Sequence, residues 1–318
     1  MKPRVVVSKC LGFARCRYDG AVISSEFTRL LKPHVEFLTV CPEVQIGLPV
    51  PRDPIRIVRE TGTEKLLQPA TGRDFTKAMT KFAESFLTSL GPVDGFLLKS
   101  RSPSCGTRDV KIYSGIHKGT PASRGAGMFG GAVLSRFPHT AIEDEGRVTN
   151  QGIREHFLIR IYAYASFRKV KTQSAMKHLV KFHSDNKLLL MAYNQQALRV
   201  MGKIVANPEK LPVDRVLNLY EEQLYRAFAT IPRYTSCINV LMHAMGYFSK
   251  DLSGKEKRFL LDTFEEFRAK RVPLSVPSSI LKAHIIRFEE PYLIKQTFFE
   301  PFPEELLTLT DSGKGRGM

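Results

Sequence analysis

Short apolar runs alternate with amphipathic helical segments through the first 150 residues. Ser25 and Glu26 precede the segment FTRLLK as a typical helix start, and a longer helical pattern covers about residues 74–90 before Gly91. The alternation predicts an α/β domain with a mainly parallel, doubly wound, Rossmann-like sheet. The runs that we interpret as its strands are RVVVS (4–8), VEFLTV (35–40), IRIVR (55–59), GFLLKS (95–100) and TAIEDEGRV (140–148).

Beyond Gly152, glycine becomes scarce and long amphipathic helical patterns take over. This change predicts an all-α domain over residues 151–318, behind an α/β domain over residues 1–150. A helix that begins near Ile153 is expected to carry the chain from one domain into the other. The longest helical patterns cover residues 153–170, 175–205, 213–229 and 254–271.

The chain carries a large positive charge. Its 48 Lys and Arg against 31 Asp and Glu give a formal net charge of +17, which is spread over both halves. Such a charge attracts polyanions, and contacts from Lys and Arg to phosphates supply sequence-independent affinity for nucleic acids. We therefore expect RNA or DNA binding, with a merely solvated basic surface as the alternative. The expected RNA contacts are Lys118, Arg124, Arg160, Arg168, Lys169, Lys171, Lys177 and Lys181.

The sequence shows no sign of membrane insertion or export. No stretch approaches the roughly 20 apolar residues of a membrane span, and the first residues form a short strand rather than a signal peptide. We therefore expect a cytoplasmic protein. In that reducing compartment, five cysteines are too few for a disulfide scaffold, and clustered thiols more often serve a metal or catalysis.

Three cysteines follow directly behind three of the expected strands. Cys10, Cys41 and Cys105 each lie just beyond a strand's carboxyl end, and in an open α/β sheet this edge forms the ligand crevice. The paired spacing of a structural zinc site is absent, and no motif identifies a histidine partner for a catalytic cysteine. Three thiolates can hold an iron–sulfur cluster with one iron left open, a Lewis acid with affinity for sulfur. Buried, inert thiols are the alternative.

Polar side chains accompany these cysteines in the segments CPEVQIGLPVPR (41–52) and KSRSPSCG (99–106). Beside an open metal site, the carboxylate of Glu43 could activate water, whereas in isolation it is more typical of a solvated surface group. Ser102 and Ser104 either share the crevice or merely cap the following turn.

Together with CLGFARCRYDG (10–20), these segments resemble the signature of the TudS-type thiouracil desulfidases, over roughly residues 3–150. The resemblance implies a 4Fe-4S cluster bound by Cys10, Cys41 and Cys105, with one iron not bound by protein and with Cys16 as the alternative to Cys10. It further implies that Glu43 is the water-activating base and Ser102 the proton donor of a reaction without net redox.

The second half, in segments 182–207 and 284–306, is similar to a helical domain found fused behind desulfidase domains. This fusion resembles bacterial desulfidases that convert 4-thiouridine in tRNA to uridine and release sulfide, and the charge of +17 suits an RNA substrate. One alternative is desulfuration of free thiouracil or thionucleosides. Another is a nucleic-acid-binding protein with a structural metal site.

The motif Gly125-x-Gly127-x-x-Gly130 matches the dinucleotide-binding fingerprint only by its spacing. It comes late in the domain and follows no clear strand, so we expect no nicotinamide cofactor. We expect instead a tight loop into a helix at Met128–Arg136, whose N-terminal amides face the cluster or a phosphate.

Two other features allow both a plain and a functional interpretation. The acidic run Glu143–Asp144–Glu145 either orients a basic side chain near the crevice or forms a solvated turn. Cys237 lies in an apolar helical run, and we expect a packed core thiol there rather than a metal ligand.

Overall fold

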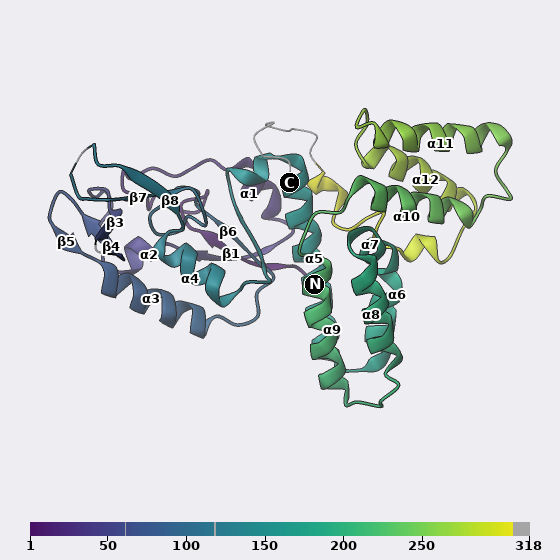
Figure 1. Cartoon of the computed structure of the whole chain (residues 1–318), viewed down its shortest axis with the longest axis horizontal. Helices are drawn as coiled ribbons and strands as arrows, with labels where there is room; N and C mark the ends of the chain where they lie inside the picture. Colours follow the sequence, from purple (N-terminus) through teal and green to yellow (C-terminus); the bar gives the residue numbers. More distant parts are fainter. Residues whose placement is uncertain (61, 118, 308–318) are drawn as a thin grey trace. The chain divides into compact units, whose positions relative to one another are not determined.

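A computed structural model describes residues 1–60, 62–117 and 119–307, and the chain divides into two compact units (Figure 1). Among the described residues, the first comprises Met1–Ala165 together with residues 305–307, and the second comprises Ser166–Glu304. The division falls within helix α5 (Gln151–Gln173), so this one helix contributes residues to both units.

Four parallel strands form the first sheet, in the order β2-β1-β6-β9. On β1, Val5, Val6 and Val7 are fully buried, as expected for a parallel strand that is covered on both faces. The prediction of an α/β domain with a mainly parallel sheet is confirmed. The strands are β1 (Arg4–Ser8), β2 (Glu36–Val40), β6 (Gly95–Leu98) and β9 (Ala141–Asp144).

The run IRIVR, which we expected among the parallel strands, lies instead in a second, mixed sheet. Its order is β5-β4-β3-β7-β8, in which β3 pairs antiparallel with β4 and parallel with β7. The other strands of this sheet were not predicted, because they carry polar residues on an exposed face and all but β4 have four residues or fewer. The strands of this sheet are β3 (Arg56–Glu60), β4 (Thr63–Gln68), β5 (Arg73–Asp74), β7 (Val110–Tyr113) and β8 (Ala122–Gly125).

One hydrophobic core joins the two sheets and two helices that lie side by side in Figure 1. Helix α3 buries Met79, Ala83 and Leu87, whose spacing of four residues places them on one face. The ring of Phe129 on α4 packs 5.8 Å, centroid to centroid, from Phe86 on α3. The α-helices that precede α5 in the chain are α1 (Glu26–Leu31), α2 (Pro42–Gln45), α3 (Thr76–Ser89) and α4 (Met128–Arg136).

The second unit is helical, which confirms the prediction for this half of the chain. Phe167 and Phe182 pack with their ring centroids 5.4 Å and 6.0 Å from that of Tyr220, whose hydroxyl lies 3.1 Å from His183 Nδ1. None of the helices in the described part of the chain is long and apolar enough to cross a membrane. The α-helices that follow α5 are α6 (Met176–Asp185), α7 (Lys187–Tyr193), α8 (Gln195–Ala206), α9 (Val213–Ala227), α10 (Tyr234–Gly246), α11 (Gly254–Arg268) and α12 (Ser275–Arg287).

Candidate active site

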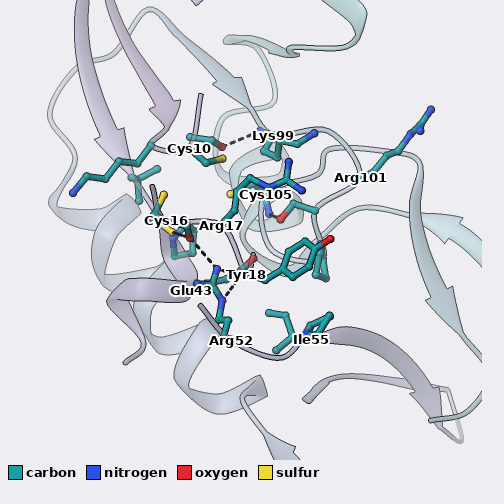
Figure 2. A pocket seen from close by; sticks show the side chains of 18 of the residues that line it. Cys10, Cys16, Arg17, Tyr18, Glu43, Arg52, Ile55, Lys99, Arg101 and Cys105 are labelled. Carbon is teal, nitrogen blue, oxygen red and sulfur yellow. Dashed lines mark hydrogen bonds and ion pairs between the residues drawn. The ribbon is translucent and has the colours of Figure 1, made fainter. Parts of the chain in front are cut away.

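Four cysteines gather at the carboxyl edge of the parallel sheet. Strands β1 and β2 end at Ser8 and Val40, and β6 leads into the loop that carries Cys105. Cys10, Cys16, Cys41 and Cys105 all line one cavity of about 290 Å³ at this edge (Figure 2). Because neighbouring parallel strands end at the same edge, the alternation of strands and helices alone brings these distant loops together.

The thiols are crowded, with Cys16 and Cys105 buried and Cys10 and Cys41 half-buried. A hydrogen bond with the Cys10 thiol, with burial, raises the pKa of Cys16 to about 11. The neighbouring Cys16 thiol and burial raise the pKa of Cys41, whose Sγ lies 3.7 Å from the carbonyl oxygen of Cys16. Burial raises the pKa of Cys105. Such thiols stay protonated until a cation displaces their protons, and metal binding at cysteine releases protons in this way.

The donor set fits an iron–sulfur cluster. Soft thiolates select such clusters, and here all of the candidate ligands are cysteines on loops of one cavity. Within residues 1–60, 62–117 and 119–307, no three Cys, His, Asp or Glu side chains are arranged to hold a single metal ion.

Glu43 lies in the first turn of α2 and is held by two partners. Arg52 Nε donates to Glu43 Oε2 over 3.0 Å, and Arg52 Nη2 pairs with the same oxygen. The hydroxyl of Ser104 donates to Oε1 over 3.0 Å. The Glu43 side chain is only 14% exposed, so the alternative of a solvated surface carboxylate is wrong.

Arg52 was missed in the sequence, although its side chain organises the site. It is only 2% exposed, and besides Glu43 it donates to the carbonyl oxygens of Pro49 (3.0 Å) and Cys16 (3.1 Å). One guanidinium thus fixes the carboxylate, the Cys16 loop and the proline-rich turn relative to each other. Its position at the end of the segment CPEVQIGLPVPR was the only signal, and residue spacing does not reveal such a partner.

Replacing Arg52 by Met should lower the free energy of unfolding by about 3–5 kcal/mol, because a buried carboxylate then loses its counter-charge. Arg52→Lys is the matched control, because it keeps the positive charge and loses only the several N–H donors of the guanidinium. Its free energy of unfolding should fall between those of the unaltered protein and Arg52→Met. Urea titrations of the three proteins measure the effect. A midpoint for Arg52→Met equal to that of the unaltered protein would show that the ion pair contributes nothing.

Ser102 shapes the loop that carries Cys105. Its Oγ accepts hydrogen bonds from the backbone amides of Ser104 (3.2 Å) and Cys105 (3.1 Å), so the capping role is realised. Ser102 also lines the cavity, and as an acceptor of two amides its hydroxyl still has a proton to donate. The two roles that we considered for this serine are therefore compatible.

The glycine motif serves the same loop. The amides of Gly127, Met128 and Gly130 at the start of α4 donate to the carbonyl oxygens of Gly106 (2.7 Å), Pro103 (3.0 Å) and Ser104 (2.9 Å). The predicted tight loop into the helix at Met128–Arg136 is observed. The expectation that these amides face a cluster or a phosphate is wrong, because the carbonyl groups of the Cys105 loop occupy them.

The acidic run forms ion pairs rather than a solvated turn. Glu145 pairs with Lys99 Nζ and accepts from the amide (2.6 Å) and the hydroxyl (2.8 Å) of Ser100, and both Lys99 and Ser100 line the cavity. Glu143 accepts from Arg147 Nε over 2.7 Å. The run thus orients a basic side chain at the crevice, as one of the two interpretations expected.

The predicted RNA contacts fall on both units. Arg124 is exposed on β8, whereas Lys118 lies outside the described residues. Arg160 Nη2 donates to the carbonyl oxygens of His139 and Thr140 (2.9 Å and 3.0 Å), which makes this residue a structural contact.

The remaining predicted RNA contacts belong to the second unit. Lys171 pairs with Glu221 over 2.7 Å, and Lys181 pairs with Asp185 over 2.6 Å. In addition to these, the candidates on α5 and α6 are Arg168, Lys169 and Lys177.

Cys237 lies in the core, as expected. It is 3% exposed, and burial raises the pKa of its thiol to about 12.

Two family models match the chain. Residues 5–145 match the 2-thiouracil desulfurase family, and residues 187–303 match a family described as a protein of unknown function, DUF1722. Among curated proteins, YbbK of Bacillus subtilis is 34% identical over 122 residues, 36% of this chain and 80% of that protein. YbgA of Escherichia coli is 27% identical over 158 residues, 49% of this chain and 93% of that protein.

A solved structure is also similar to part of the chain. The [4Fe-4S]-dependent thiouracil desulfidase TudS is 32% identical and is matched over 46% of this chain and 92% of its own, with a TM-score of 0.37. The segments that carry the four cysteines and Glu43 all lie within residues 5–145. Through these residues, the chain belongs to the 2-thiouracil desulfurase family.

Proposed function

We propose that the protein is a 4Fe-4S-dependent desulfidase that converts 4-thiouridine in tRNA to uridine and releases sulfide. The observation that carries the proposal is the cavity of four cysteines beside a largely buried, ion-paired Glu43 in a chain of the 2-thiouracil desulfurase family. A structural metal site would need no such carboxylate and no cavity large enough for a base. The geometry therefore favours an enzyme over a binding protein with a structural metal.

Cys10, Cys41 and Cys105 would hold the cluster, with Cys16 as the alternative to Cys10. When bound through three protein ligands, such a cluster supplies one open iron, a Lewis acid with affinity for thiocarbonyl sulfur. The Arg52 and Ser104 contacts orient Glu43, whose Oε1 takes a proton from the attacking water. Ser102 Oγ gives a proton to the departing sulfur.

The reaction balances without an oxidant or a reductant. One water is consumed for each thiocarbonyl group, its oxygen ends on the base, and its two protons leave with the sulfide. No electrons are exchanged. The residues therefore only need to position water and move protons, which is the work that Glu43 and Ser102 are placed to do at the cavity.

An RNA substrate is supported by the charge of the chain. A free base needs no net charge of +17, whereas a folded RNA presents many phosphates. A thiouridine stacked inside RNA must turn out of the stack to reach the cavity, at a cost of a few kcal/mol that contacts to the RNA backbone would offset. The family's name and a cavity of about 290 Å³ also suit free thiouracil or a thionucleoside, which is the second candidate.

The two candidates differ in their response to salt. We expect the cluster-loaded full chain to show a higher kcat/KM for 4-thiouridine in tRNA than for free 2-thiouracil, and only the tRNA value should fall steeply with salt. Initial rates on both substrates over a series of salt concentrations provide the measurement. Equal use of the free base, with no salt dependence on tRNA, would favour the second candidate.

A further inference from the structure

A second cavity, of about 450 Å³, adjoins the cysteine cavity. Both are lined by Tyr18, Pro54, Ile55, Arg101 and Pro103, so these residues form the border between them. Figure 2 shows Tyr18 beside Ile55 at the edge of the site and Arg101 extending away from it. The second cavity therefore leads out of the site over the mixed sheet, and we call it the sheet groove.

Three cations form one row across the floor of this groove. Lys111 on β7 lies directly opposite Arg124 on β8, and Arg56 on β3 precedes Ile57, which is paired with Ile112 on β7. Ile57 and Ile112 are buried in the core, so Arg56 and Lys111 share the opposite face of the sheet. Like charges placed opposite each other destabilise a sheet, and the exposed ion pair of Arg124 with Asp109 offsets only part of this cost.

The other residues that line the groove suit the binding of a nucleotide chain. Among the residues that the structure describes, Asp109 is the one acidic side chain that lines the groove. It pairs with Arg124 over 3.3 Å, with both side chains more than 60% exposed. The guanidinium of Arg56 lies 4.9 Å from the ring centroid of Tyr113, and Tyr18 is 43% exposed at the border. Cations along a groove with aromatic rings among them are typical of surfaces that bind single-stranded nucleic acid.

The border itself is held in an unusual backbone conformation. Arg101 has a φ of 57°, in the left-handed region that a residue with a side chain rarely adopts. Such strain concentrates at functional sites, where surrounding structure maintains it. Here the residue that adopts it lines both the cysteine cavity and the sheet groove.

We propose that the sheet groove binds the RNA backbone next to the thiolated nucleotide, while the base itself enters the cysteine cavity. This inference rests on the proposed function and places an RNA contact on the α/β unit. Neighbouring strands lie about 4.8 Å apart, so the row from Arg56 to Arg124 spans about 10 Å, more than a single phosphate covers. A strand with successive phosphates matches this length.

The test removes two of the cations and compares a matched control. Lys111→Gln/Arg124→Gln and the control Lys77→Gln/Lys81→Gln each lose two positive charges, but the control residues are exposed on α3, outside the groove. For the groove variant, we expect the slope of log affinity against log salt for non-thiolated tRNA to decrease by about 2, one for each lost phosphate contact. The ratio of kcat/KM on thiolated tRNA to that on free thiouracil should also fall, and the control should change neither quantity.

Three results would overturn the inference. The first is an equal salt slope for the two double variants, and the second is an unchanged ratio of kcat/KM on tRNA to that on thiouracil in the groove variant. The third is a loss of kcat/KM on thiouridine monophosphate as large as that on tRNA, which would mean that a single phosphate occupies the groove. Failure of the proposed function is seen separately, since the unaltered protein would then remove no sulfur from tRNA. The groove variant loses both the like-charge contact of Lys111 with Arg124 and the exposed ion pair of Arg124 with Asp109, two small effects of opposite sign. Its melting temperature should therefore stay close to that of the unaltered protein, which shows that it is folded.

Discussion

Replacing Glu43 by Gln should reduce the rate of desulfuration by about 10²–10⁴-fold, the range that a positioned general base contributes. The amide keeps the shape of the side chain and can still accept the hydrogen bond from Ser104, but it cannot take a proton from water. Single-turnover rates of the cluster-loaded variant, expressed per cluster, measure the effect. Counting clusters is needed because Arg52 loses its counter-charge in this variant and stability falls as well.

Ser104→Ala is the control for this prediction. It removes the donor to Glu43 Oε1 and keeps the carboxylate, so we expect a modest loss of rate rather than near-complete inactivation. If Glu43→Gln turned over substrate at the unaltered rate per cluster, the assignment of the base would be wrong. Equal losses in both variants would mean that orientation of the side chain matters and its proton transfer does not.

Replacing Gly130 by Ala should displace the loop that carries Cys105 and prevent cluster assembly. A Cβ atom at this position would lie 2.2 Å from the carbonyl oxygen of Gly106 and 2.7 Å from that of Cys105. Both are backbone atoms, so the helix and the loop must move apart, and overpacking of this kind costs about 1–3 kcal/mol or more. Iron and acid-labile sulfide per chain after anaerobic reconstitution, with the melting temperature, measure the two effects.

The neighbouring Gly131 provides a matched control in the same helix. A Cβ there meets only the Cβ of Ala126, at 3.6 Å, which is ordinary van der Waals contact. Because alanine favours a helix over glycine by about 0.5–1 kcal/mol, Gly131→Ala should be slightly more stable and load iron normally. Similar behaviour of the two variants would contradict the role that we assign to the close approach at Gly130.

The sequence was sufficient to locate the parallel sheet and the cysteines at its edge. Runs such as RVVVS and GFLLKS are continuous apolar segments, and each is followed by a cysteine, so the topology of parallel strands places the thiols together. Apart from β3, the mixed sheet escaped prediction because one of its faces is solvated and β5, β7 and β8 have four residues or fewer. The segment ASRG contains no buried residue, and only its pairing with β7 makes it a strand.

The contacts that organise the site could not be predicted from local pattern. Glu43 depends on Arg52 and Ser104, and the latter is 61 residues away, while Lys99 meets Glu145 across 46 residues. Such pairs follow from how loops meet at the sheet edge and leave no periodic signal in the chain. The glycine motif shows the opposite problem, since its spacing suggests phosphate binding, whereas the fold uses it to pack a helix against the Cys105 loop.

The most direct test of the account is turnover by the full chain with and without its cluster. The protein would be reconstituted under anaerobic conditions, incubated with tRNA containing 4-thiouridine, and followed by the absorbance of the thione and by the sulfide released. We predict that the thione absorbance band of 4-thiouridine disappears only when the cluster is present, with one sulfide formed for each base converted. Loss of the band at the same rate without the cluster, or no loss on either tRNA or free thiouracil with the cluster loaded, would contradict the account.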